Sequence, residues 1–168
     1  MSAMDVSDES FMCAVQKVIQ MLPGISELYP SQLELLRSLV DQQNTFLTSP
    51  TNSGKTLPAV ILPKVLEELN AMGFLSFSTN SKVLFLTALN SIQLSLLAGT
   101  RSLGIKCDSV TSKNVVQVLN SDASVVFIGP ELIQMPHVTR ALITARKTFC
   151  LKVIDEVHLC NYCSKLCS

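Results

Sequence analysis

Short, largely apolar runs at residues 83–86, 125–128 and 151–154 are the clearest feature of the hydrophobic pattern. Runs of four such residues, with little polar alternation, are typical of strands buried on both faces of a parallel sheet. We expect further short strands at 45–48 and 107–110. Cys150 joins the last of the three runs, so its thiol is expected to be buried as a small hydrophobic group.

Helical spacing of apolar residues alternates with these runs. The first helix is expected to end at Pro23-Gly24. Ser31 and Glu34 have the spacing of a capping box for the second, and Pro63 should bend the third. The predicted helices span 11–21, 31–40, 56–72, 91–103 and 113–119. Alternating helices and strands predict an α/β fold, with His137 in a surface loop.

Composition agrees with a folded domain. Hydrophobic residues make up 48% of the 168 positions and charged residues 15%, too apolar a balance for a disordered chain. No run approaches the ~18–20 apolar residues of a membrane span. Asp5, Asp8 and Glu9 argue against a targeting peptide, so we expect a reducing compartment without disulfides. The net charge is zero and gives no separate support for nucleic-acid binding.

The stretch Ser-Pro-Thr-Asn-Ser-Gly-Lys-Thr at 49–56 has the composition of a loop that binds phosphates. It lies between a predicted strand and a predicted helix, the order that such a loop requires. Gly54 leaves room where a Cβ would meet a phosphate. Lys55 is expected to reach the β- and γ-phosphates, and the Thr56 hydroxyl to hold Mg²⁺. The loop backbone would surround the polyphosphate through Pro50, Thr51, Asn52 and Ser53. Ser49 departs from the usual first glycine.

A pair of carboxylates follows the last predicted strand. Asp155 and Glu156 lie at its C-terminal end, where open α/β sheets bind their ligands. Asp155 is expected to hold Mg²⁺, and Glu156 to orient or deprotonate the attacking water. Such pairs also occur as plain solvated groups. Their position in chain order after the phosphate loop favours a nucleotide site that both segments build.

Together these motifs resemble the first RecA-like domain of superfamily 2 helicases of the DEAD/DEAH-box type. Asp-Glu-Val-His at 155–158 pairs with Pro-Thr-Asn-Ser-Gly-Lys-Thr at 50–56, and Leu-Tyr-Pro-Ser-Gln at 28–32 is most similar to the RecQ branch. The resemblance implies a P-loop NTPase fold, a three-layer sandwich around a mostly parallel sheet. It further implies that Gln32 reads the adenine of ATP and that His158 couples the ATP site to nucleic acid.

Two further segments resemble family motifs that contact a nucleic-acid backbone. One lies at 83–89 and assigns this role to Thr87 and Ala88; the other lies at 125–131 and assigns it to Pro130 and Glu131. Ala88 stands where the family usually has proline, and Gly129 where threonine is commoner. The resemblance implies a DNA partner before an RNA partner, 3′–5′ unwinding driven by ATP and Mg²⁺, and a location in the nucleus or the cytoplasm.

The predicted domain plan is a helical extension over 1–24, an incomplete ATP-binding domain over 25–159 and a tail over 160–168. The sequence stops ten residues after His158, before the family's second RecA-like domain and its arginine finger. We therefore expect this polypeptide to bind ATP weakly and not to unwind a duplex by itself. The alternative is a catalytically inactive fragment that only binds a nucleotide or a partner. A small metabolic P-loop kinase fits less well, because it does not need the segments at 28–32 and 155–158.

Cys160, Cys163 and Cys167 bring together three possible metal ligands. Structural zinc takes four ligands, usually as two pairs, and the resemblance assigns His158 to another role. The simpler interpretation is a tail beyond the folded core.

Overall fold

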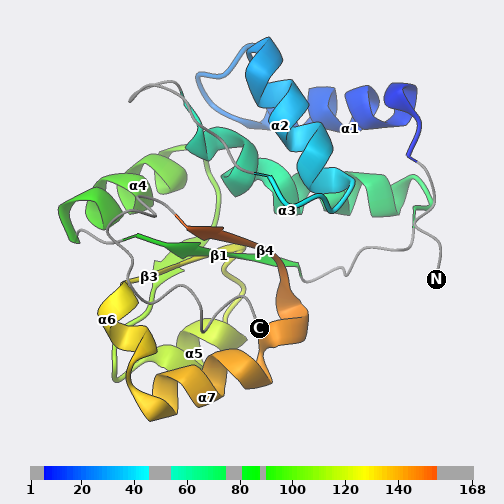
Figure 1. Cartoon of the computed structure of the whole chain (residues 1–168). Helices are drawn as coiled ribbons and strands as arrows, with labels where there is room; N and C mark the ends of the chain where they lie inside the picture. Colours follow the sequence, from blue (N-terminus) through cyan, green and yellow to red (C-terminus); the bar gives the residue numbers. More distant parts are fainter. Residues whose placement is uncertain (1–5, 46–53, 75–80, 88–89, 155–168) are drawn as a thin grey trace. The chain divides into compact units, whose positions relative to one another are not determined.

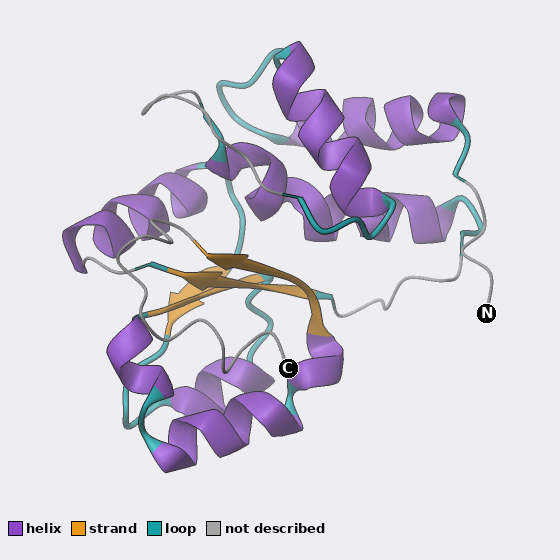
Figure 2. Cartoon of the chain, viewed as in Figure 1, coloured by secondary structure: helices purple, strands orange, loops and turns teal. Residues whose placement is uncertain are grey.

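The computed structural model describes residues 6–45, 54–74, 81–87 and 90–154, with only the backbone of Asn90 and Ser91. The chain divides into two compact units, 1–81 and 82–168 (Figure 1). Within the described residues the first unit contains only helices, and all the strands belong to the second (Figure 2). The predicted boundary after residue 24 does not coincide with the boundary between the units. The one predicted near 159 lies outside the described residues.

The first unit is built around α3 (Thr56–Ala71), against which α1 (Asp8–Met21) and α2 (Pro30–Val40) both pack. Helix α3 contains the fully buried Ile61, Val65 and Leu69. Val15 and Val18 of α1 are fully buried as well, so this helix belongs to the core of the unit. Pro63 lies inside α3, and the helix runs past it to Ala71, one residue short of its predicted end; the bend expected at Pro63 stays a prediction.

The start of α2 differs from the predicted capping box. Pro30 occupies the first helical position, where its fixed φ suits the helix and its missing N–H costs nothing. The helix therefore begins one residue earlier than expected, after Tyr29. Its third position is then Gln32, whose Oε1 accepts the Tyr29 backbone N–H at 2.9 Å. The predicted pair of Ser31 and Glu34 does not form this cap.

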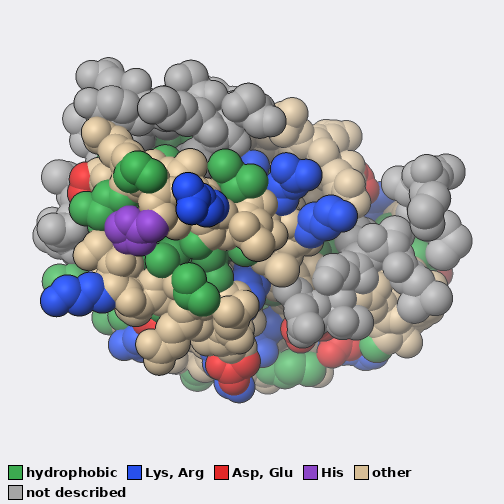
Figure 3. Space-filling view, turned by 90° about the horizontal axis from the view of Figure 1, so that it is seen from below, with side chains coloured by type: hydrophobic (Ala, Val, Ile, Leu, Met, Phe, Trp, Pro, Cys, Tyr) green, Lys and Arg blue, Asp and Glu red, His purple; other side chains and the backbone are tan. Residues whose placement is uncertain are grey.

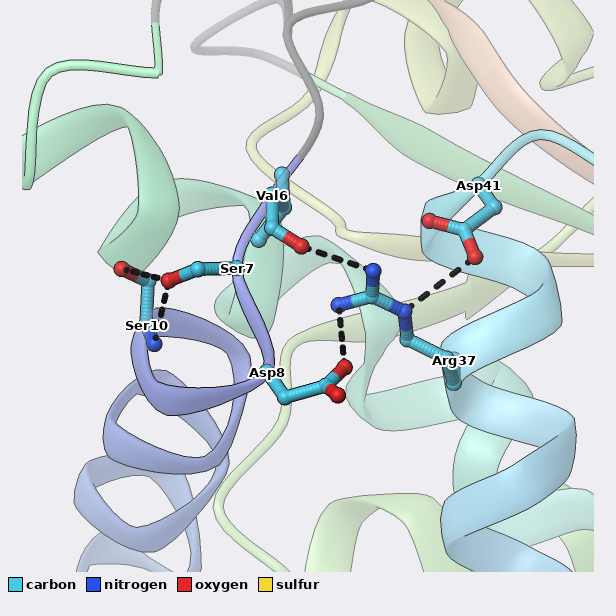
Figure 4. A network of polar contacts seen from close by, with 6 residues as sticks. All are labelled: Val6, Ser7, Asp8, Ser10, Arg37 and Asp41. Atoms are coloured by element: carbon cyan, nitrogen blue, oxygen red, sulfur yellow. Dashed lines mark hydrogen bonds and ion pairs between the residues drawn. The ribbon is translucent and has the colours of Figure 1, made fainter.

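A cluster around Arg37 ties α2 to the start of α1 (Figure 4). Its Nη2 donates to the Val6 carbonyl at 2.7 Å, and its Nε to Asp41 at 3.2 Å. Nη1 lies 3.6 Å from the Asp8 carboxylate, an ion pair too long for a hydrogen bond. The guanidinium also stacks 5.3 Å from the Phe11 ring centroid. The planar fork of arginine allows one side chain to satisfy these partners together.

The second unit contains a four-stranded sheet in the order β2–β3–β1–β4, and every pairing is parallel. The strands are β1 (Lys82–Leu86), β2 (Cys107–Ser109), β3 (Val125–Ile128) and β4 (Phe149–Ile154). β1 and β3 lie in the middle and are buried along their whole lengths, as the continuous apolar runs predicted. The α/β class and the parallel sheet are thus confirmed.

The last strand differs from its prediction. β4 is the outer neighbour of β1 among the described strands; Cys150 and Lys152 are exposed and its other four residues are half-buried. Cys150 is exposed, so its predicted burial was wrong. The reason is the position of the strand: Lys152 already breaks the apolar run, and a strand at the edge of a sheet does not need apolar side chains on both faces.

Helices cover this sheet on both faces. α4 (Asn90–Ser102) packs on β2 and β3, and the Cys107 thiol donates to the Leu97 carbonyl at 3.5 Å. On the opposite face lie α5 (Val115–Asn120), α6 (Pro130–Ile133) and α7 (Pro136–Thr144) (Figure 1). There Leu84, Leu86, Val126 and Ile128 pack into one apolar cluster with residues of the three helices. The short 3₁₀ helix η1 (Arg146–Thr148) then leads into β4.

Helix α7 was not predicted. Val138 and Leu142 are its buried residues, four positions apart on one helical face. His137, expected in a loop, lies in this helix; it is exposed as predicted, and its Nε2–H donates to the Ser112 carbonyl at 2.9 Å. The missed signal was Pro136, because proline is common at the first helical position.

Lys82 begins β1 with a buried ammonium group. Its Nζ donates to the carbonyls of Ser121 and Ala123, at 2.6 and 2.7 Å. Burial lowers the pKa of Lys82, and the Asp122 carboxylate opposes this shift. The side chain thus joins β1 to the turn between α5 and β3.

Candidate functional site

The described part of the predicted phosphate loop is its last segment, Gly54 to Thr56. Gly54 has φ +68°, a left-handed conformation that glycine adopts without strain. Its carbonyl accepts the Leu57 N–H at 3.1 Å. Lys55 follows as the N-cap residue and Thr56 is the first residue of α3, which has 16 residues. The Leu57 N–H is therefore already bonded and Pro58 has none, so at this end an anion is favoured mainly by the partial positive charge of the helix dipole.

Gln32 contacts this segment directly. Its Nε2 donates to the Gly54 carbonyl at 3.0 Å, while its Oε1 holds the Tyr29 N–H. The side chain is only 5% exposed. A Cβ on residue 54 would lie 2.5 Å from Gln32 Nε2, so a larger residue here would force the Gln32 amide to move and break its bond, besides adopting a φ that favours glycine. The two residues lie 22 positions apart in the chain.

The amide of Gln32 retains some hydrogen-bonding capacity after these two contacts. An amide oxygen has two lone pairs and an NH₂ group two protons, so one of each remains. The sequence predicted Gln32 as a reader of adenine, which stays a prediction. Sequence reasoning missed its contact with Gly54. The only available signal was the pairing of a glutamine at the start of a helix with a phosphate-loop motif.

The second unit aligns the C-terminal ends of three strands. Leu86 of β1 is in register with Ile128 of β3 and with Ile154 of β4. The segments that follow these strands therefore begin at the same edge of the sheet, where open α/β sheets bind their ligands. Three of the predicted segments begin there: one after Leu86, one after Ile128, and the acidic pair, which directly follows Ile154.

The residues predicted to contact nucleic acid differ in accessibility. Thr87 is 1% exposed, and its Oγ1 has no hydrogen-bond partner among the described residues. A buried hydroxyl cannot reach a nucleic-acid backbone in this conformation. Pro130 begins α6 and is half-buried, and Glu131 is exposed. The Glu131 carboxylate lies where a Cβ on Gly129 would project, so a threonine at 129 would require that side chain to move.

The remaining predicted site residues lie outside the described residues. These are Pro50, Thr51, Asn52, Ser53, Ala88, Asp155, Glu156, His158, Cys160, Cys163 and Cys167. Lys55 belongs to the first unit, and the strand that leads to Asp155 belongs to the second. That Lys55 and Asp155 bind the same triphosphate and its Mg²⁺ therefore remains a prediction.

No group of three or more His, Cys, Asp or Glu residues within the described ranges could hold a metal ion. None of the helices in these ranges combines the length and apolar character that crossing a lipid bilayer requires. No protein-family model matches the chain, and a search of curated proteins found no match. The helicase resemblance thus depends on the motifs and their order alone.

Proposed function

We propose that the chain is the ATP-binding lobe of a superfamily 2 helicase, RecQ-like and directed to DNA. The observation that carries the proposal is the hydrogen bond from Gln32 Nε2 to the Gly54 carbonyl. It joins two segments that were matched separately to family motifs, the one at 28–32 and the phosphate loop. A chance match of either motif would not predict that they meet.

The proposed site gives each of these residues a defined role. Lys55 neutralises the terminal phosphates, and the N-terminus of α3 attracts phosphate oxygens through the helix dipole and the Thr56 amide. The Thr56 hydroxyl and the Asp155 carboxylate would hold Mg²⁺, which would neutralise charge on the phosphates. Glu156 orients the attacking water, and His158 couples the ATP site to the loops that hold nucleic acid. Gln32 fixes Gly54 and reads the adenine with its remaining N–H and lone pair.

Equilibrium titration of the full chain with a fluorescent ATP analogue tests this proposal. Saturable binding that requires Mg²⁺ and is displaced by unlabelled ATP is expected. Absence of saturable binding at millimolar nucleotide would refute it. If the nucleotide binds, phosphate release stimulated by single-stranded DNA, measured with a second RecA-like domain supplied, would separate a helicase lobe from an inactive nucleotide-binding fragment.

Exchanging Gln32 for glutamate isolates the contact with Gly54. In Gln32→Glu one carboxylate oxygen can still accept the Tyr29 N–H, but the other faces the Gly54 carbonyl without a proton to donate. Losing a hydrogen bond of this kind costs about 1 kcal/mol or more, so we expect inorganic tripolyphosphate to bind about fivefold or more weakly. Competition against the fluorescent analogue measures this.

Gln20→Glu is the matched control, since it makes the same charge change at an exposed position of α1, and it should leave the affinity unchanged. Because tripolyphosphate lacks a base, its weaker binding would show that Gln32 acts on the loop. Weaker binding of ATP alone, with tripolyphosphate unaffected, would assign Gln32 to the base only.

A further inference from the structure

The zero net charge conceals an uneven distribution between the two units. Residues 1–81 contain four Lys or Arg and eight Asp or Glu, for a net charge of −4, and residues 82–168 contain nine and five, for +4. Within the second unit, residues 132–154 include Arg140, Arg146, Lys147 and Lys152 and no carboxylate. The basic character that the total charge hides is thus concentrated in α7, η1 and β4.

Three of these cations form what we call the α7 stripe: Arg140, Arg146 and Lys147. All three are exposed, and none of them has an ion-pair partner among the described residues. Lys106 and Lys17 differ from these three cations, because Lys106 forms an ion pair with Asp122 and Lys17 with Glu68. An unpaired, solvated cation can bind an external anion without breaking an internal contact.

The stripe occupies α7 and the 3₁₀ turn that follows it. Val138 and Leu142 face the apolar cluster on the sheet, so Arg140 is left on the outer side of α7. Arg146 and Lys147 lie in η1, which follows the end of α7 and leads into β4. Six positions separate Arg140 from Arg146, roughly 9–10 Å of chain at helical rises. Figure 3 shows several separate Lys and Arg side chains on one face, with apolar side chains between them and Asp and Glu side chains toward its rim.

We propose that the α7 stripe binds the phosphodiester backbone of single-stranded nucleic acid. Cations carried on two consecutive elements match a polyanion, in which about three phosphates occupy 9–10 Å at the spacing of one strand of a duplex. Arginine can bind a phosphate with two parallel hydrogen bonds. The inference goes beyond the proposed function because it assigns the contact to residues of α7 and η1 in place of Thr87 and Pro130. It depends on charge and exposure and does not require the ATP site.

Fluorescence anisotropy of a labelled 15-nucleotide oligo-dT, titrated with the full chain between 50 and 200 mM salt, tests the inference. Neutralising three phosphates on a single strand contributes about −2 to the slope of log K against log salt. The triple variant Arg140→Gln, Arg146→Gln, Lys147→Gln should therefore bind at least about tenfold more weakly at 50 mM salt, with a slope shallower by about 2. Its ATP-analogue affinity should stay unchanged, which separates this inference from the proposed function.

The matched control is Lys17→Gln, Arg101→Gln, Lys106→Gln, which removes the same charge at exposed positions outside the stripe. It should keep the wild-type slope, and thermal unfolding should show both variants folded. An equal loss in both triple variants, an unchanged α7 variant, or no oligonucleotide binding by the wild type at 50 mM salt would overturn the proposal. So would an α7 variant that loses binding to phosphatidylserine vesicles but keeps its affinity for oligo-dT.

Discussion

Lys55→Ala is expected to weaken the binding of ATP·Mg²⁺ about 30- to 100-fold. Lys55 is the N-cap residue of α3 and directly follows the glycine that Gln32 holds. A charged hydrogen bond to a phosphate contributes about 1.5–3 kcal/mol, and about 2–2.7 kcal/mol corresponds to this change in affinity. Titration with the fluorescent ATP analogue at constant Mg²⁺ measures it.

Lys64→Ala is the control for this prediction. Lys64 is nine residues further along the same helix and is half-buried, so the exchange removes an equal charge from α3 away from its N-terminus. Its nucleotide affinity should match the wild type. Equal affinities for both variants and the wild type would contradict the assignment of Lys55 to the phosphates, provided that their thermal unfolding shows intact folds.

Phe127→Ala is expected to destabilise the second unit by about 3–5 kcal/mol, the usual cost of removing a fully buried phenylalanine. Phe127 lies in the central strand β3 with an exposed fraction of 0%. Its ring packs on Phe85 of β1, with 5.5 Å between the ring centroids. The loss is a large part of the 5–15 kcal/mol that stabilises a typical domain. Urea unfolding followed by circular dichroism measures it.

Ile143→Ala is the control variant for Phe127→Ala. Ile143 lies in α7 and is 56% exposed, so its truncation should change the free energy of unfolding by less than about 0.5 kcal/mol. If Phe127→Ala unfolds at the same urea concentration as Ile143→Ala, β3 is not at the centre of the unit. Separate transitions of the two units would be analysed individually, because one free energy describes only a two-state transition.

The central part of the sheet could be predicted because its apolar runs have one physical explanation. Residues 83–86 and 125–128 contain no polar position, and such runs fit only strands covered on both faces. The place of β4 outside β1 among the described strands could not be assigned in this way, since strand order depends on pairings between remote segments. Its polar Lys152 was the one local indication.

Short helices were the weakest point of the sequence-based interpretation. Helix α7 has nine residues, too few for its apolar spacing to differ clearly from chance. The start of α2 shows a different difficulty. Ser31 and Glu34 satisfy the capping-box spacing, but so does Tyr29 with Gln32 once Pro30 fixes the first turn. Only the structure distinguishes the two registers.

The candidate site was predictable in its local parts. Gly54, Lys55 and Thr56 lie at the start of a long helix, as the loop motif requires. The bond between Gln32 and Gly54 depends on how α2 packs against α3, which no local pattern specifies. The total charge gave no sign of the α7 stripe, because the net charges of the two units, −4 and +4, cancel.

A double-mutant cycle tests most directly whether Lys55 and Asp155 act on one bound triphosphate. The affinity for ATP·Mg²⁺ would be measured for the wild type, Lys55→Ala, Asp155→Asn and the double variant. Residues that hold the same ligand through its phosphates and metal ion should be coupled, so the double variant should differ from the sum of the single effects by about 0.5–3 kcal/mol. Effects that add to within about 0.3 kcal/mol, or an Asp155→Asn variant with unchanged affinity, would contradict the account.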